Sequence, residues 1–109
     1  LVTSGPGGTN AVTSCAASYL DSVPHLFISG QAFYNQTVTF HPGLRQLGVQ
    51  EINIIDIVRP ITKWAVMLTP NSNVEWTLET MFNIMKDGRP GPCWLDIPGD
   101  VQMKQYAPI

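Results

Sequence analysis

Short apolar runs alternate with longer amphipathic segments along the chain. Four of these runs, at residues 1–3, 25–29, 64–68 and 92–98, have the continuity of buried strands. The segments between them place apolar residues at helical spacing. The order strand, helix, strand, helix, strand, helix, strand implies right-handed crossover connections. We therefore predict an α/β fold, a three-layer parallel sheet with helices on both faces.

The first two predicted helices differ in how their ends are marked. Thr9 or Asn10 is placed to cap the free backbone N–H groups at the start of the first helix. The second helix is short, and Pro60 should end or distort it. Their apolar stripes are Ala11, Val12, Cys15, Ala16, Tyr19 and Leu20 in the first, and Ile54, Ile55, Val58 and Ile61 in the second.

The third predicted helix, residues 71–87, has the clearest signals. Ser72 and Glu75 form a capping-box pattern at its start. Gly88 and Pro90 should stop it, because glycine favours the helix end and proline cannot continue a helix. Its predicted apolar stripe consists of Val74, Leu78, Met81, Phe82 and Met85.

Ligands of open parallel sheets bind beyond the carboxyl ends of the strands. Four stretches should meet at that edge: residues 4–10, 29–31, 69–70 and 96–98. Residues 31–50 keep no periodicity, and unstructured loops of this length are more often functional than simple connections. We therefore expect a binding site at the glycine-rich first stretch and at the start of the long loop.

The turn "TSGPGGTN" suggests a specific kind of ligand. Glycines before a helix are typical of phosphate sites, but Gly5, Gly7 and Asn10 lack the third glycine of the dinucleotide fingerprint. No Lys-Ser or Lys-Thr pair follows, and Pro6 removes an N–H donor. A flat, neutral heterocycle fits better, held against the Pro6 ring and hydrogen-bonded by Asn10.

Two other interpretations of the turn remain open. Glycines at a junction between strand and helix can simply permit a tight turn, as in a non-catalytic α/β scaffold or regulatory domain. Alternatively, the start of the helix binds a nucleotide. In that case adenine nucleotides should protect the fold against heat.

Composition narrows the class of protein further. The 109 residues are 44% hydrophobic and 13% charged, with a formal net charge of −2, as expected of one globular domain in the cytoplasm. The lysines and arginines form no cluster that would bind nucleic acid, and no apolar run is long enough to span a membrane. Cys15 and Cys93 have no metal-ligand or redox spacing, so we expect reduced core thiols. Leu1 already reads as part of a strand, so we expect a fragment.

Four phrases in order carry a resemblance to a known family: "TSGPGGTNAVT", "AASYLDSVPHLFISGQ", "RQLGVQEINIIDIVRPITK" and "GRPGPCWLDIPGDVQ". Together they resemble the later part of the N-terminal pyrimidine-binding domain of thiamine diphosphate enzymes, nearest to acetolactate synthase and its relatives. The match covers residues 1–102. Residues 103–109 are expected to form an exit linker.

This resemblance implies a partial domain. The family's first strands and its cofactor-activating glutamate would lie upstream of Leu1, so we assign no catalytic residue here. The diphosphate-binding domain would supply Mg²⁺, so we assign no metal ligand either, and a flavin requirement stays open. The chain alone should be inactive, and the parent enzyme should be a homodimer or homotetramer.

The resemblance also implies which residues bind thiamine diphosphate. In the family, the proline and asparagine of the Gly-Pro-Gly turn contact the aminopyrimidine end of the cofactor, which corresponds to Pro6 and Asn10. We place Gly5 and Gly7 of the same turn in this site. A glutamine after the long loop approaches cofactor or substrate, which corresponds to Gln50.

The implied reaction is decarboxylation of a 2-keto acid and ligation of the acyl unit to an acceptor, with the cofactor as electron sink. We place Gln31 in the substrate channel. Acetolactate synthases usually continue Val-Pro-Arg after this glutamine, whereas this chain reads Ala32, Phe33 and Tyr34. We therefore expect an altered channel and leave the keto acid open.

Four other polar residues are weaker candidates. His25 and His41 are isolated, and single histidines are more often structural or solvated. Glu51 follows a long loop, so we expect a hydrogen bond that anchors the loop. Asp96 ends the fourth strand and either reaches the site or holds the following turn.

Overall fold

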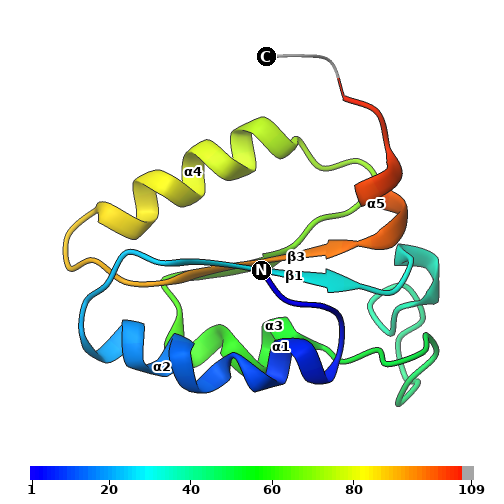
Figure 1. Cartoon of the computed structure of the whole chain (residues 1–109). Coiled ribbons are helices and arrows are strands. Elements are labelled where there is room, and N and C mark those ends of the chain that lie inside the picture. The colour runs from blue at the N-terminus through cyan, green and yellow to red at the C-terminus, as the bar shows by residue number, and fades with distance from the viewer. Residues whose placement is uncertain (107–109) are drawn as a thin grey trace.

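Three parallel strands form the centre of the fold (Figure 1). The computed structural model describes residues 1–106. The strands are β1 (Leu26–Gln31), β2 (Trp64–Met67) and β3 (Cys93–Pro98). Their order in the sheet is β1-β3-β2. The connection from β1 to β2 therefore passes over one strand position, and β3 then occupies that position. The predicted parallel sheet is confirmed.

The first predicted strand contributes only a single parallel bridge. Val2 pairs with Ser29 on the edge of β1 that faces away from β3. The Val2 N–H donates to the Ile28 carbonyl at 2.9 Å, and the Gly30 N–H donates to the Val2 carbonyl at 3.0 Å. The bridge at Val2 therefore adds this segment to the sheet beside β1, in the part of the chain where a strand was predicted.

Helices cover both faces of the sheet, as predicted (Figure 1). Three lie on one face and α4 lies on the other, with α5 following directly after β3. Two 3-10 helices, η1 (Tyr34–Gln36) and η2 (Arg59–Ile61), belong to the connections. The α-helices are α1 (Pro6–Asn10), α2 (Val12–Leu20), α3 (Ile54–Val58), α4 (Val74–Lys86) and α5 (Gly99–Met103). None of the helices within residues 1–106 has the length and apolar character needed to cross a membrane.

Each strand divides its side chains between two cores, because neighbouring residues of a strand point to opposite faces. The core under α1, α2 and α3 contains Cys15, Phe27, Ile54, Ile55, Val58, Ala65 and Trp94. The core under α4 contains Leu68, Met81, Met85, Cys93, Leu95 and Val101. Both cysteines are free and buried, as predicted, and burial raises the pKa of the Cys15 thiol to about 11.

The start of the first helix differs from the prediction. Gly5, not Thr9 or Asn10, is the N-cap, and its φ of 59° and ψ of −121° turn the chain directly into α1. Pro6 at the first helical position needs no N–H partner and has a preset φ. Thr9 instead donates its hydroxyl to the Pro6 carbonyl at 3.1 Å. The helix breaks at Ala11 before α2, but Ala11, Val12 and Cys15 of the predicted stripe pack in or against the core.

The end of the predicted stripe is exposed. Tyr19 and Leu20 are 42% and 71% exposed, whereas Cys15 and Ser18 are buried. The Ser18 hydroxyl can be buried because it forms a hydrogen bond with the His25 ring, with 3.0 Å between Oγ and Nδ1. His25 thus has a structural partner, as expected for an isolated histidine.

The third predicted helix starts later than its capping-box pattern indicated. The N-cap of α4 is Asn73, whose side chain accepts from the Trp76 N–H at 3.0 Å. Ser72 is not the cap, because its hydroxyl accepts from the Thr69 N–H at 2.8 Å in the preceding turn. Phe82 of the predicted stripe is 49% exposed, while Met81 and Met85 are buried.

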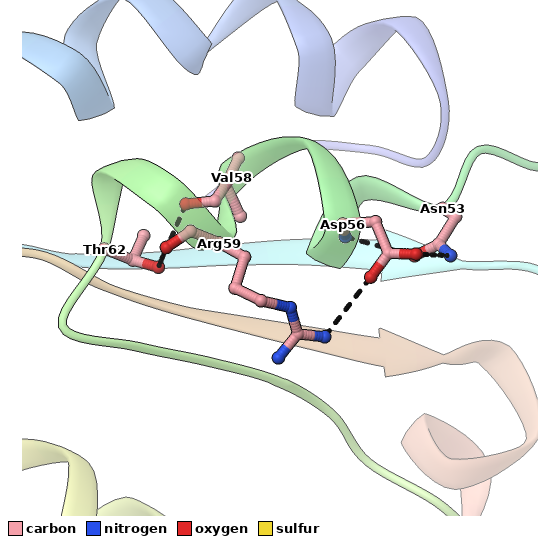
Figure 2. A network of polar contacts seen from close by, with 5 residues as sticks. All are labelled: Asn53, Asp56, Val58, Arg59 and Thr62. Atoms are coloured by element: carbon pink, nitrogen blue, oxygen red, sulfur yellow. Dashed lines mark hydrogen bonds and ion pairs between the residues drawn. The ribbon is translucent and has the colours of Figure 1, made fainter.

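Helix α3 shows how local chemistry limits a short helix (Figure 2). At its start, Asn53 Oδ1 accepts from the Asp56 N–H at 3.3 Å, and Asn53 Nδ2 donates to the Asp56 carboxylate at 2.8 Å. At its end, the Thr62 hydroxyl donates to the Val58 carbonyl at 3.0 Å. Pro60 lies in η2, so the helix ends where the sequence predicted.

The expected exit linker begins within an ordered part of the fold. Met103 ends α5, which the sequence did not predict, and Val101 of that helix is buried. Lys104 then donates its ammonium group to the Pro70 carbonyl at 2.7 Å. Residues 107–109 of the expected linker lie outside the described residues.

Candidate functional site

The stretches that we predicted to meet at the carboxyl ends of the strands lie close together in the structure. Ser29 of β1 donates its hydroxyl to the Asp96 carboxylate of β3 at 2.7 Å. The Leu68 N–H, next to Thr69, donates to the Asp96 carbonyl at 2.9 Å. A Cβ added at Gly30 would lie 3.7 Å from the Ser4 backbone nitrogen, so the glycine-rich turn lies against β1.

The turn and the long loop meet at Gly5 and Gln50. A Cβ added at Gly5 would lie 2.3 Å from the Gln50 carbonyl oxygen, so only glycine allows this approach. Gln50 itself has a φ of 55°, in the left-handed region that few non-glycine residues adopt. The contact brings together two of the five residues expected to bind the cofactor. It also stores backbone strain at the place where they meet.

Pro6 and Asn10 lie on one face of α1. They are four residues apart in a helix, so their side chains point the same way. Both are exposed. No hydrogen bond among residues 1–106 uses the Asn10 carboxamide, which leaves its donor and acceptor for a ligand or water. The pair therefore forms a small surface with an apolar ring beside an amide.

Close packing inside the protein explains why glycine occupies position 7. A Cβ at this position would lie 2.6 Å from the Thr3 methyl carbon. Gly5 and Gly7 thus both allow close packing inside the protein, which requires no ligand. Of the predicted cofactor residues, only Pro6, Asn10 and Gln50 present exposed side chains.

Gln31, expected in the substrate channel, faces into the protein and is 8% exposed. Its Nε2 donates to the Ile52 carbonyl at 2.8 Å and to the Asp96 carboxylate at 3.0 Å. Its Oε1 accepts from the Ala32 N–H at 2.9 Å. The carboxamide is therefore held by the loop and the sheet.

Asp96 is the centre of a buried polar cluster that the sequence left partly unassigned. It is 1% exposed, and its two carboxylate oxygens accept separately from Ser29 and Gln31. Burial raises its pKa to about 6, although the hydrogen bonds from Ser29 and Gln31 oppose this shift. The Trp94 indole N–H donates to the Ser29 hydroxyl at 2.8 Å.

Ser29 was missed as a member of this cluster. The available signal was its position, since Phe27, Ser29 and Gln31 alternate along β1 and must share a face. A serine and a glutamine following a phenylalanine on a buried face indicate a polar partner on the neighbouring strand. The identity of that partner, Asp96, depends on the strand register.

Glu51 anchors the loop, as predicted. Its carboxylate accepts from the backbone N–H groups of Val38, Leu47 and Gly48, the last two at 2.9 Å and 3.2 Å. These three donors belong to two separate parts of the loop. Glu51 is thus committed to holding the loop's shape and is buried.

A hollow of about 520 Å³ opens beside this cluster, between α3, the edge strand β2 and the long loop. Gln31, Glu51 and Asp96 contribute to its wall, together with Trp64 of β2 and Arg59. Pro6 and Asn10 do not line it. The exposed face of α1 is therefore separate from this hollow.

The fold and this edge agree with a known class of protein. Residues 1–57 match the family model described as thiamine pyrophosphate enzyme, N-terminal TPP binding domain. This match spans more than half of the chain, and the chain belongs to that family. The family expected from the four sequence phrases is thus confirmed.

Curated relatives are similar over nearly the whole chain. The acetolactate synthase large subunit of Haemophilus influenzae is 40% identical over 100 residues, which cover 92% of this chain and 16% of the relative. The acetolactate synthase of Arthrospira platensis is 40% identical over 111 residues, covering 100% of this chain and 18% of the relative. The acetolactate synthase isozyme 3 large subunit of Escherichia coli is 35% identical over 101 residues, with 93% and 16% covered. The chain thus spans less than a fifth of the length of these relatives.

Proposed function

We propose that this chain binds thiamine diphosphate as part of a longer acetolactate synthase-like enzyme. In this proposal the parent enzyme decarboxylates a 2-keto acid and ligates the acyl unit to an acceptor. Membership of the thiamine pyrophosphate enzyme family and the similarity to acetolactate synthases support it. The bound cofactor would supply the electron sink for decarboxylation.

The exposed face of α1 is the observation that carries this proposal. Pro6 offers an apolar ring, and Asn10 offers an amide donor and acceptor beside it, both at the carboxyl edge of the sheet. This combination fits the flat, uncharged pyrimidine ring, which has apolar faces and nitrogen groups at its rim. Gln50 would approach the same ligand from the loop, since Gly5 draws that part of the loop close.

The remaining parts of the site would come from outside residues 1–109. A glutamate upstream would exchange a proton with the ring, and a diphosphate-binding domain would hold Mg²⁺. Two or four copies of the parent enzyme would then complete the sites, and the chain alone would be inactive. A cytoplasmic location stays a prediction.

Substrate choice in this proposal depends on the residues after Gln31. The Phe33 ring packs so closely on the turn after β3 that a Cβ at Gly99 would lie 2.8 Å from Phe33 Cε1. The Tyr34 N–H donates to the Asp100 carboxylate at 3.0 Å. These contacts hold Phe33 and Tyr34 where acetolactate synthases usually have Val-Pro-Arg, so we expect an altered channel and leave the keto acid open.

The test is Asn10→Leu in the parent enzyme. We expect its dissociation constant for thiamine diphosphate, measured by calorimetry with saturating Mg²⁺, to rise about tenfold, since the amide hydrogen bonds are lost. Asn83→Leu makes the same chemical change at an exposed position of α4, on the opposite face, and should leave the constant unchanged. Equal constants for Asn10→Leu and wild type would remove Asn10 from the site.

A non-catalytic scaffold or regulatory domain is the second candidate function. It is favoured by one observation, that Gly5 and Gly7 each meet protein atoms and need no ligand. Absence of thiamine diphosphate uptake by the parent protein at saturating cofactor and Mg²⁺ would decide for this alternative. A protein that adenine nucleotides alone protect against heat would instead support nucleotide binding.

A further inference from the structure

A continuous path of hydrogen bonds joins β3 to the end of the long loop. It runs from the Asp96 carboxylate to Gln31 Nε2 at 3.0 Å, and from the same nitrogen to the Ile52 carbonyl at 2.8 Å. Asp96 and Gln31 are 8% exposed or less. Ile52 lies two residues after Gln50, the loop residue that meets Gly5.

We propose that Asp96 is a positioning residue, which fixes Ile52 through the carboxamide of Gln31 and thereby places Gln50 against the glycine-rich turn. This inference rests on the proposed function in one respect, that Gln50 approaches the cofactor. Within residues 1–106, the Asp96 carboxylate forms hydrogen bonds to Ser29 and Gln31 and none to α1 or Gln50. It acts through the backbone of the loop.

The bond from Tyr34 to Asp100 holds the start of the loop, whereas the anchor near its end, Glu51, is internal to the loop. Glu51 accepts only from N–H groups of the loop itself, at Val38, Leu47 and Gly48. Those bonds give the loop a shape and do not attach it to the sheet. The bond from Gln31 to Ile52 makes that attachment, directly beside the strained Gln50 backbone.

A carboxylate suits this position better than an amide. Each Asp96 oxygen accepts one bond, from the Ser29 hydroxyl and from Gln31 Nε2. Asparagine would turn an NH₂ group toward one of these donors and leave it without an acceptor. Gln31 cannot compensate by flipping, since its Oε1 already accepts from Ala32.

The charged groups around Asp96 leave this arrangement intact at neutral pH. Glu51, Asp56 and Arg59 line the same hollow, and Arg59 pairs with Asp56 at 3.2 Å. Glu51 is committed to loop N–H groups. Burial raises the pKa of Asp96 to about 6, so above that pH the carboxylate has two acceptors for its two donors.

The test compares Asp96→Asn with Ser29→Ala in the parent enzyme. Ser29→Ala also breaks a bond to Asp96 and leaves the Trp94 indole without its acceptor, but it keeps the path to Ile52. Amide hydrogen exchange of residues 46–53 is measured without cofactor, together with the melting temperature and the dissociation constant for thiamine diphosphate.

We expect both variants to melt at lower temperature, since each leaves buried polar groups unpaired. Only Asp96→Asn should speed exchange in residues 46–53 and weaken cofactor binding, each by about tenfold. Ser29→Ala should leave both within about twofold of wild type. Equal exchange in the two variants, or unchanged exchange in Asp96→Asn, overturns the positioning role.

Gln31→Met provides the same test if Asp96→Asn does not fold. It breaks the path from the other end and keeps the bond between Ser29 and Asp96. Unchanged exchange in residues 46–53 of Gln31→Met overturns the inference. Because exchange is measured without cofactor, it decides the role of Asp96 even if the wild-type enzyme takes up no thiamine diphosphate, a result that would end the proposed function alone.

Discussion

The two faces of the sheet are built differently although the same strands supply both. The face under α4 is apolar along its whole length. The face under α1, α2 and α3 is apolar at the amino end and polar at the carboxyl end. Along β1 the first face receives Leu26 and Ile28, while the second receives Phe27, then Ser29, then Gln31.

This difference indicates that the two faces have different roles, one in stability and the other in fixing the arrangement of residues at the carboxyl edge. Apolar packing under α4 contributes stability without any directional requirement, because the hydrophobic effect depends on buried area. The polar cluster around Asp96 requires defined partners, and within residues 1–106 no buried side-chain nitrogen or oxygen lacks one. A satisfied buried network specifies one arrangement, which is useful beside a binding edge.

The largest expected effect is a loss of stability on the apolar face. Met81→Ala removes a fully buried side chain of α4 and should lower the free energy of unfolding by about 2–5 kcal/mol. Cofactor affinity of the folded protein should not change, because α4 covers the face of the sheet opposite α1 (Figure 1). Urea unfolding and calorimetry check both, with exposed Glu79→Ala as the control. A weaker cofactor affinity in Met81→Ala would contradict the division between faces.

On the polar face, stability should depend on pH through Asp96. Its pKa rises from 3.8 to about 6 on folding, so the folded state holds the proton more tightly than the unfolded state. Stability from this group is complete below about pH 4 and is lost as the pH rises through about 6, by roughly 3 kcal/mol. Urea unfolding of wild type and Asp96→Asn at pH 4 to 7 measures the difference. Parallel curves for the two proteins would show that Asp96 does not titrate in this range.

The smallest expected effect concerns polar groups at the surface. Arg59 and Asp56 pair at 3.2 Å with side chains 64% and 67% exposed (Figure 2). Solvent screens such pairs, so Arg59→Gln should change the free energy of unfolding by less than about 0.5 kcal/mol. Thermal melts at low and high salt check this. A larger change in the free energy of unfolding would show that the exposed pair of Arg59 and Asp56 stabilises the fold as strongly as a buried polar group.

Local patterns in the sequence determined the alternation of strands and helices, the end of α3 just before Pro60 and the role of Glu51 as loop anchor. These features depend on neighbours a few residues away, whose periodicity and side-chain chemistry are visible in the sequence. The family was also recognisable from four ordered phrases. Pro6, Asn10 and Gln50 remain predicted cofactor residues, now placed on exposed positions at one edge.

Only the tertiary structure decided which distant groups meet. Asp96 and Gln31 are 65 residues apart, and nothing in the local pattern of either residue names the other. The approach of Gln50 to Gly5 likewise depends on how the long loop folds back. Helix α1 begins at Pro6 directly after Gly5, whose positive φ and close approach to Gln50 both favour glycine. Periodicity specifies which face a side chain occupies, whereas its partner depends on strand register and loop closure, which the whole chain sets together.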